Sequence, residues 1–342
     1  MNLVIHQAPQ STDAYEAHST LAHFYLRIGR FHDAEAQIRA MLAADPRASN
    51  LRNLESLFAL LANYPDLTIL RSYPDAVHSE TIDGNIYAPV RVNGYAGTYM
   101  LDTGINLSIM SESEAARLGL TPHSSTATLS DIGGATSAPL QVVEVDDLII
   151  GRTHLRHVPF LVFADANGAF TGVPPSHCGI LGIQPLLALG ALGFRTDGTL
   201  SIASKVETGT TTEPLLFDGE MPLTQISYRD KPLAVTFDVG ATQTTFNPPF
   251  AKLYPEILRS GVNESHTLNG LSGATEKQSI SLPHLSLNFG REVTLAPATI
   301  LLDQTGGSSA WAAANLGYDL MQQAEPFTID FRKMRIEFGA SQ

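Results

Sequence analysis

Two short motifs carry the side chains best suited to chemistry in this chain. They are Asp102-Thr103-Gly104 and Asp238-Val239-Gly240. When two carboxyl groups lie close together, ionisation of one opposes ionisation of the other, so one can serve as a general base and the other as a general acid. Such a pair can activate water and hydrolyse a peptide bond. The elements around Asp102 and Asp238 decide whether these two side chains can form such a pair.

Each motif directly follows a predicted hairpin. In the first, strand-like runs over 86–92 and 95–101 flank Asn93-Gly94, a pair that favours a type I′ turn. In the second, runs over 223–228 and 232–237 flank a polar turn over 229–231. The distance from the first turn residue to the aspartate is nine residues in both. Glycine after each aspartate lets the two loops approach where a side chain would collide.

The similarity continues downstream of both motifs. Residues 133–136 are echoed by 272–275, and Gly179-Ile180-Leu181-Gly182 is echoed by 314–317. The last glycine of this second element lies 80 residues after Asp102 and 79 residues after Asp238. Each copy then closes with a strand-like run, over 198–202 and 334–338. We infer an internal repeat of two similar halves.

This pattern resembles the aspartic proteases, the bilobal group that includes pepsin-like and retropepsin-like enzymes, over about residues 82–340. The resemblance implies a mainly β fold with two β-barrel-like lobes in one chain, over 82–206 and 212–340. It implies an aspartic-type endopeptidase, a hydrolase in which Asp102 and Asp238 are catalytic. Its substrate would be an extended peptide or protein, and no cofactor or metal is expected. The crossing strands would contain Ile180-Leu181-Gly182 and Leu316-Gly317.

The residues that the resemblance assigns to support of the catalytic loops are Thr103, Gly104, Val239, Gly240 and Thr242. Val239 stands where the family has threonine or serine, whose hydroxyl reaches the other lobe. The loss of one such hydrogen bond costs about 1 kcal/mol. Ile105, Asn106 and Asn315 also depart from the family pattern. These departures leave a second reading open, a catalytically weak or inactive peptide-binding or scaffold protein on the same fold.

Glycine-rich hairpin tips are the predicted flaps that would hold the substrate. They contain Ile132, Gly133 and Gly134 in the first half, and Gly270 and Gly273 in the second. The alternative is that both are ordinary surface turns. No tyrosine lies between residues 123 and 144, so the first flap is closer to the retropepsin pattern than to the pepsin pattern.

An Ala- and Leu-rich segment precedes the repeat, and we place an N-terminal helical segment over 1–75. Apolar spacing predicts a helix that stops at Gly29, a second over 31–44 and a third over 51–62. The segment resembles a tetratricopeptide repeat at Leu21, Ala22, Tyr25, Gly29, Phe31, Ala34 and Pro46. Because such repeats need several neighbours, we favour a helical cap, or an arm that docks a protein partner, over a peptide-binding solenoid.

Composition excludes several other classes. The 342 residues carry 21 Lys and Arg against 34 Asp and Glu, a net charge of −13 that disfavours nucleic acid. Cys178 is the single cysteine, so neither an intramolecular disulfide nor a thiolate zinc site is expected. His154 and His157 lie three apart in a strand-like run, so we expect them on opposite faces and not on one metal.

The location of the protein is left open by the sequence. Residues 186–194 form the longest apolar stretch, which is too short to span a membrane. The first residues lack the pattern of a signal peptide, so we expect a soluble protein, cytoplasmic as written or exported if a signal was removed before Met1. Since both aspartates belong to one chain, a monomer is the expected state.

Overall fold

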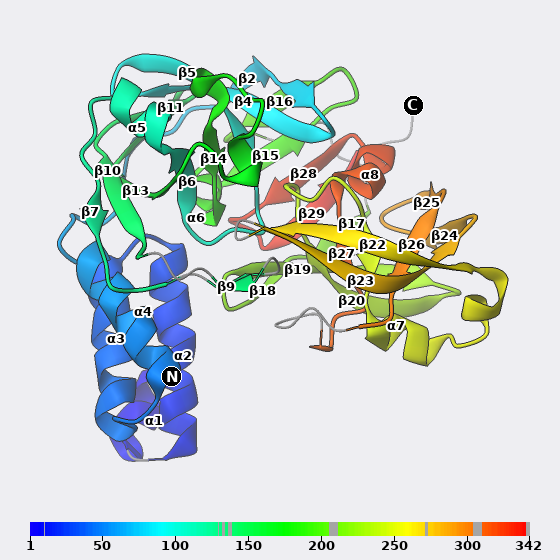
Figure 1. Ribbon diagram of the computed structural model, residues 1–342, viewed down its shortest axis with the longest axis horizontal. Coiled ribbons are helices and arrows are strands. Elements are labelled where there is room, and N and C mark those ends of the chain that lie inside the picture. The colour runs from blue at the N-terminus through cyan, green and yellow to red at the C-terminus, as the bar shows by residue number, and fades with distance from the viewer. Residues whose placement is uncertain are drawn as a thin grey trace.

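The computed structural model describes residues 1–9, 11–128, 130–131, 134–135, 139–204, 211–270, 273–303 and 310–339. For residues 49–50, 130–131 and 134–135 it describes the backbone alone. The chain is mainly β, with a small helical segment at its N-terminus (Figure 1). This confirms the predicted fold class.

Four helices stand together at the N-terminus, beside the first sheet (Figure 1). Their bounds are α1 Asn2–Gln7, α2 Thr12–Arg27, α3 Phe31–Ala44 and α4 Ser49–Leu61. The Ser11 side chain caps α2 by accepting a hydrogen bond from the N–H of Ala14 at 3.1 Å. Gly29, with φ of 73°, turns the chain between α2 and α3, as predicted. The first helix, α1, was not predicted.

The first sheet contains the first predicted hairpin. Its order is β1 (Thr68–Arg71), β12 (Thr153–Arg156), β11 (Leu148–Ile150), β4 (Asn85–Val92), β5 (Tyr95–Leu101), β14 (Gly179–Leu181), β6 (Ser108–Ser111), β13 (Val158–Phe163), β10 (Gln141–Val145) and β7 (His123–Ser124), with β3 (Glu80–Ile82) beside β4. Asn93 and Gly94, with φ of 47° and 86°, form the two-residue turn between β4 and β5. Because β1 and β3 begin before residue 82, strand pairing starts earlier in the chain than the predicted lobe.

The second sheet repeats the central part of this order. It runs β22 (Val262–Gly270), β23 (Gly273–Leu282), β26 (Ala298–Leu301), β21 (Thr245–Phe246), β27 (Ala314–Leu316), β20 (Lys231–Phe237), β19 (Met221–Tyr228), β24 (Leu285–Asn288) and β25 (Glu292–Leu295), with β18 (Leu216–Asp218) beside β19. In both sheets the second strand of the hairpin, β5 or β20, leads into the aspartate. It pairs in parallel with a short strand, β14 or β27. That strand then pairs antiparallel with β6 or β21.

The second hairpin differs from the prediction in one detail. Its turn consists of Arg229 and Asp230, with φ of 49° and 60°, and Lys231 already pairs with Tyr228. Two residues with positive φ are enough to close a hairpin, so the third residue joins the strand.

A bridging sheet joins the two halves of the chain. Its order is β17 (Thr212–Pro214), β29 (Arg335–Phe338), β28 (Phe327–Asp330), β15 (Ala191–Phe194), β16 (Thr199–Ile202) and β2 (Asp75–His78). The strands predicted to close each copy are therefore β16 and β29. Shorter elements complete the chain: α5 Glu112–Arg117, α6 Ile183–Ala188, α7 Pro248–Leu253, α8 Tyr318–Met321, the 3₁₀ turns η1 Gly168–Phe170, η2 Pro175–His177, η3 Ile257–Ser260 and η5 Gln322–Ala324, and the strand pair β8 Ser130–Asp131 and β9 Gly134–Ala135.

Two apolar cores support this arrangement. One runs through both halves and the bridging sheet, where Phe194 stacks on Phe327 with ring centroids 4.7 Å apart. The other lies between the N-terminal helices and the first sheet, and includes Phe58 and Leu61 of α4. The helices thus share a core with the first half.

Helix α2 also touches the second half of the chain. Gln184 of α6 donates a hydrogen bond to the carbonyl of Leu26 at 2.6 Å. On the other side, His23 Nδ1 lies 2.6 Å from Glu220 Oε1, and the Arg27 guanidinium lies 4.1 Å from the ring centroid of Phe217. The helical segment is therefore tied to both halves.

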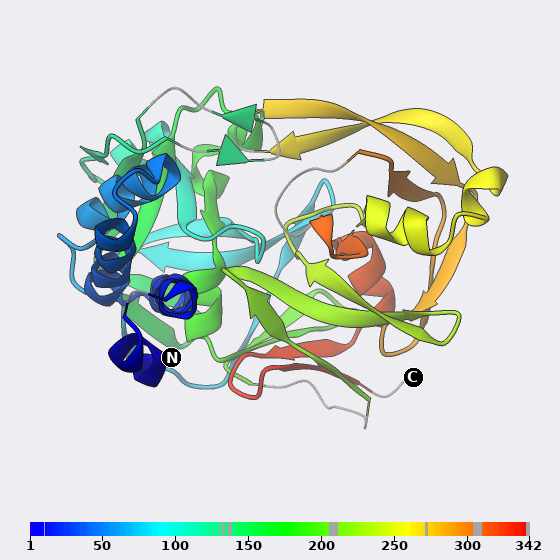
Figure 2. The ribbon, with the colours of Figure 1, turned by 90° about the horizontal axis from the view of Figure 1, so that it is seen from below.

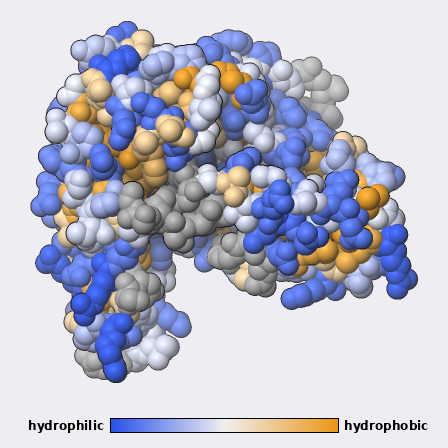
Figure 3. Space-filling model, viewed as in Figure 1, coloured by the Kyte–Doolittle hydropathy of each residue, from blue (hydrophilic) through white to orange (hydrophobic). Residues whose placement is uncertain are grey.

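The visible outer face of the N-terminal helices is mostly hydrophilic (Figure 3). Across the described ranges, every helix is too short or too polar to cross a membrane.

Candidate active site

The two predicted aspartates occupy equivalent positions at the ends of β5 and β20. The backbone N–H of Asp102 donates to the carbonyl of Leu181 at 3.0 Å, and the N–H of Asp238 donates to the carbonyl of Leu316 at 3.0 Å. The short parallel strand beside each hairpin therefore continues its pairing by one residue and fixes the backbone of the aspartate.

A hydroxyl ties each aspartate loop to the glycine after its crossing strand. Gly182 donates its N–H to Ser108 Oγ at 3.1 Å, and Gly317 donates its N–H to Thr244 Oγ1 at 2.9 Å. A Cβ on either glycine would collide with the backbone of the loop, which explains the glycines. Sequence reasoning missed Ser108 and Thr244. Their signal was a hydroxyl six residues after each aspartate.

The side chains of Asp102 and Asp238 meet and share a hydrogen bond. The loops can approach this closely because a Cβ on Gly104 would lie 2.5 Å from an Asp238 oxygen, and a Cβ on Gly240 would overlap the Asp102 carboxyl. The N–H of Gly104 donates to Asp102 Oδ1 at 2.7 Å, and that of Gly240 donates to Asp238 Oδ1 at 2.9 Å. Both aspartates keep part of their surface accessible to solvent.

Both carboxyls hold their protons more tightly than usual. Burial raises the pKa of Asp102 well above its ordinary range, and the negative charge of Asp238 raises it further. Burial also raises the pKa of Asp238, although hydrogen bonds from the Gly240 N–H and the Asn315 amide oppose that rise. The pair therefore suits acid-base chemistry in which one proton is shared.

Thr103 links the two aspartate loops. Its hydroxyl donates to the carbonyl of Phe237 at 3.0 Å and accepts from the N–H of Val239 at 3.1 Å. The side chain of Val239 is fully buried and has no hydroxyl with which to make the reciprocal pair of bonds. Thr242, which the resemblance also assigned to this support, is exposed and faces Gly84.

Asn315 lies next to the pair. In the sequence it only breaks the pattern of the second crossing strand, yet its Nδ2 lies 3.5 Å from Asp238 Oδ2. Its Oδ1 accepts a hydrogen bond from Thr236 Oγ1 at 2.6 Å. The contact depends on the register of β20 and β27, in which Thr236 and Asn315 are opposite, and the sequence pattern alone does not show it.

The predicted flap residues are described in part. Ile132 and Gly133 lie outside the described residues, whereas Gly134 begins β9, which pairs with β8. Gly270 ends β22 and Gly273 begins β23, so these two flank the tip of a long hairpin. Strand β22 contacts η1 of the first half, and Figure 2 shows this hairpin extending toward β8 and β9.

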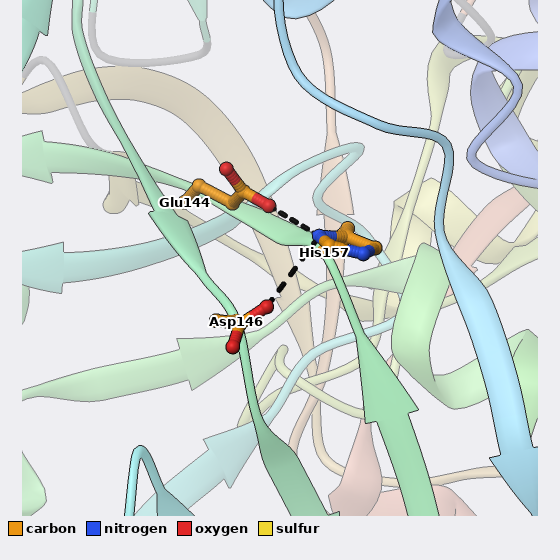
Figure 4. A group of neighbouring side chains, drawn as sticks. All are labelled: Glu144, Asp146 and His157. Atoms are coloured by element: carbon orange, nitrogen blue, oxygen red, sulfur yellow. Dashed lines mark hydrogen bonds and ion pairs between the residues drawn. The ribbon is translucent and has the colours of Figure 1, made fainter.

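The two predicted surface histidines bind different carboxylates. His154 pairs with Asp147, and His157, with φ of 60°, breaks the strand alternation on which their expected opposite faces depended. His157 Nδ1 lies 2.5 Å from Glu144 and 3.6 Å from Asp146 (Figure 4).

These three residues also form a group that could offer a metal one ligand atom each, within 4.8 Å of one another. However, Asp146 also accepts hydrogen bonds from the Arg156 guanidinium at 3.1 and 2.5 Å. Since both carboxylates already have basic partners, we assign the group to ion pairing.

One of three comparisons with known proteins gives a match to a defined part of the chain. No curated protein gave a significant match. A crystal structure of a retropepsin-like aspartic protease from Rickettsia conorii shares 15% identity with the chain, covers 40% of this chain and 94% of its own, and gives a TM-score of 0.28. Residues 88–184, which include Asp102, match the family model described as aspartyl protease. This match supports an aspartic protease family for the part of the chain that carries Asp102.

Proposed function

We propose that this protein is an aspartic endopeptidase that cleaves extended peptides with water activated between Asp102 and Asp238. The observation that carries the proposal is the hydrogen bond between these two carboxyls, which come from equivalent hairpins far apart in the chain. Both side chains are partly exposed to solvent, which supports access of water to the pair.

The chemistry needs one ionised and one protonated carboxyl. The ionised carboxylate takes a proton from water while the water oxygen bonds to the scissile carbonyl carbon. The protonated carboxyl gives its proton to the carbonyl oxygen, which accepts the C=O π electrons. The C–N bond then breaks, the amine leaves with the proton that the first carboxylate took, and the second carboxyl recovers its own. Atoms and charges balance with water as the only co-reactant.

We infer that the site lies between two lobes of a duplicated, pepsin-like body, over 82–206 and 212–340. The repeated strand order, the equal hydrogen bonds of both aspartates and the bridging sheet support this. Since each half supplies one carboxyl, a monomer has a complete site.

The hairpin of β22 and β23 is our proposed flap of the second half, with β8 and β9 as the flap of the first. A peptide under two such hairpins would be bound by main-chain hydrogen bonds as an added strand. The contact of β22 with η1 supports a hairpin that reaches across the site.

A peptide-library digest at several pH values tests this function. The wild type should release defined fragments, with Asp102→Asn and Asp238→Asn as controls. If the wild type binds extended peptides across acid and neutral pH and cleaves none, the scaffold reading replaces the protease. Thr103, Gly104 and Gly240 are retained where the two aspartate loops meet, and this favours the protease.

A further inference from the structure

The environments of the two aspartates match in their backbone and differ in one pair of side chains. In the first half, Met100 of β5 is opposite Ile180 of β14. In the second half, Thr236 of β20 is opposite Asn315 of β27. An apolar pair beside Asp102 is thus replaced by a polar pair beside Asp238.

The amide of Asn315 is held in a defined orientation. Its Oδ1 accepts from Thr236 Oγ1 at 2.6 Å, and this hydroxyl also lies 3.2 Å from the carbonyl of Ala314. With the oxygen of the amide bound to a hydroxyl, the NH₂ group is the one that faces Asp238 Oδ2, at 3.5 Å. The arrangement therefore presents a donor to this carboxyl.

The backbone donors do not distinguish the two carboxyls. Asp102 receives backbone hydrogen bonds from Gly104 and Ile105, and Asp238 receives the equivalent bonds from Gly240 and Ala241. These N–H groups, the partner carboxyl and Asn315 are the polar groups described as acting on the pair. A hydrogen bond to a carboxylate favours its charged form, so the additional donor selects Asp238 as the ionised member.

We propose that Asn315 is a positioning residue that keeps the negative charge of the pair on Asp238 and the shared proton on Asp102. The inference rests on the proposed protease function. It assigns the roles that the chemistry leaves open, since Asp238 takes the proton of the attacking water and Asp102 gives its proton to the carbonyl oxygen. The pKa values agree in direction, because Asn315 opposes the rise at Asp238, whereas among the described residues no side-chain amide is found to act on Asp102.

The test replaces Asn315 by isoleucine, the residue found at the equivalent place of the first half. Without the donor, ionisation of Asp238 becomes harder, so the acid limb of the kcat/KM profile should move up by about half to one pH unit, a three- to tenfold change in the ionisation constant. KM at the optimum should stay unchanged. Asn288→Ile, the same exchange at an exposed position of β24 outside the aspartate loops, is the matched control and should leave the profile in place.

A second measurement does not depend on cleavage. A ¹³C NMR titration of the aspartate carboxyls, assigned with the two Asp→Asn variants, should show Asp238 ionising first in the wild type and a smaller separation in Asn315→Ile. If the wild type cleaves no peptide, the proposed function fails and this titration still decides the inference. If Asn315→Ile does not fold, Thr236→Val, which removes the anchor of the amide, should move both readouts in the same direction. Unmoved readouts in the folded variant, or Asp102 ionising first in the wild type, would overturn the inference.

Discussion

Thr103 and Val239 are joined across the two aspartate loops in one direction only. Thr103 Oγ1 accepts a hydrogen bond from the N–H of Val239 at 3.1 Å and donates to the carbonyl of Phe237. The buried valine offers no hydroxyl in return. One threonine therefore supplies both of these side-chain links between the loops.

We expect Thr103→Val to lower the free energy of unfolding by about 2–3 kcal/mol, because a buried N–H and a buried C=O lose their partner. Urea unfolding measures this. Thr103→Ser keeps the hydroxyl and should remain within about 1 kcal/mol of the wild type. The reciprocal change, Val239→Thr, nearly preserves volume and should stabilise by about 1 kcal/mol if its hydroxyl reaches the first loop. Equal stability of Thr103→Val and the wild type would refute the link.

The raised pKa of Glu325 predicts that the folded protein loses stability as the pH rises. Burial raises the pKa of this carboxyl to about 7, although the Tyr318 hydroxyl donates to it. The folded protein therefore binds a proton that the unfolded chain releases at lower pH, so this contribution is complete below the unfolded pKa and is lost as the pH rises through about 7.

Chemical unfolding between about pH 4 and pH 8 should show a decline of up to about 3 kcal/mol from this group. Glu325→Gln cannot titrate and should flatten the decline. A variant with the same slope as the wild type would contradict the assignment.

From the hydrogen bonds of Asn53 in α4 we predict that the helical segment contributes to substrate binding. Its side chain accepts from the N–H of Thr128 at 2.8 Å and donates to the carbonyl of Thr128 at 2.9 Å. Thr128 lies just before β8 of the proposed first flap. Asn53→Ala should loosen the start of the flap and raise KM severalfold with kcat little changed. Asn63→Ala is the control, because the Asn63 amide donates a hydrogen bond to the carbonyl of Ala59, within the N-terminal helical segment. Equal KM values for both variants would exclude the role.

Local patterns explain what the sequence could predict. The turn at Asn93-Gly94, the stop at Gly29 and the strands before both aspartates depend on residues close in the chain, so their spacing was informative. The repeated spacing also pointed to Asp102 and Asp238, which the structure brings into contact.

Long-range register explains what the sequence could not predict. Asn315 looked like a defect in a strand pattern, because its contact with Asp238 depends on the pairing of β20 with β27, about 80 residues apart. The ties of Arg27 and His23 to the second half likewise depend on how α2 packs. Such contacts arise from tertiary packing, which spacing alone does not encode.

The most direct test compares peptide cleavage by the wild type, Asp102→Asn and Asp238→Asn, with melting temperature as the check of folding. Each variant removes one acid-base group and keeps the shape of the side chain, so both should fold and lose cleavage by at least about a thousandfold. Undiminished turnover in either folded variant would contradict a reaction carried by these two carboxyls.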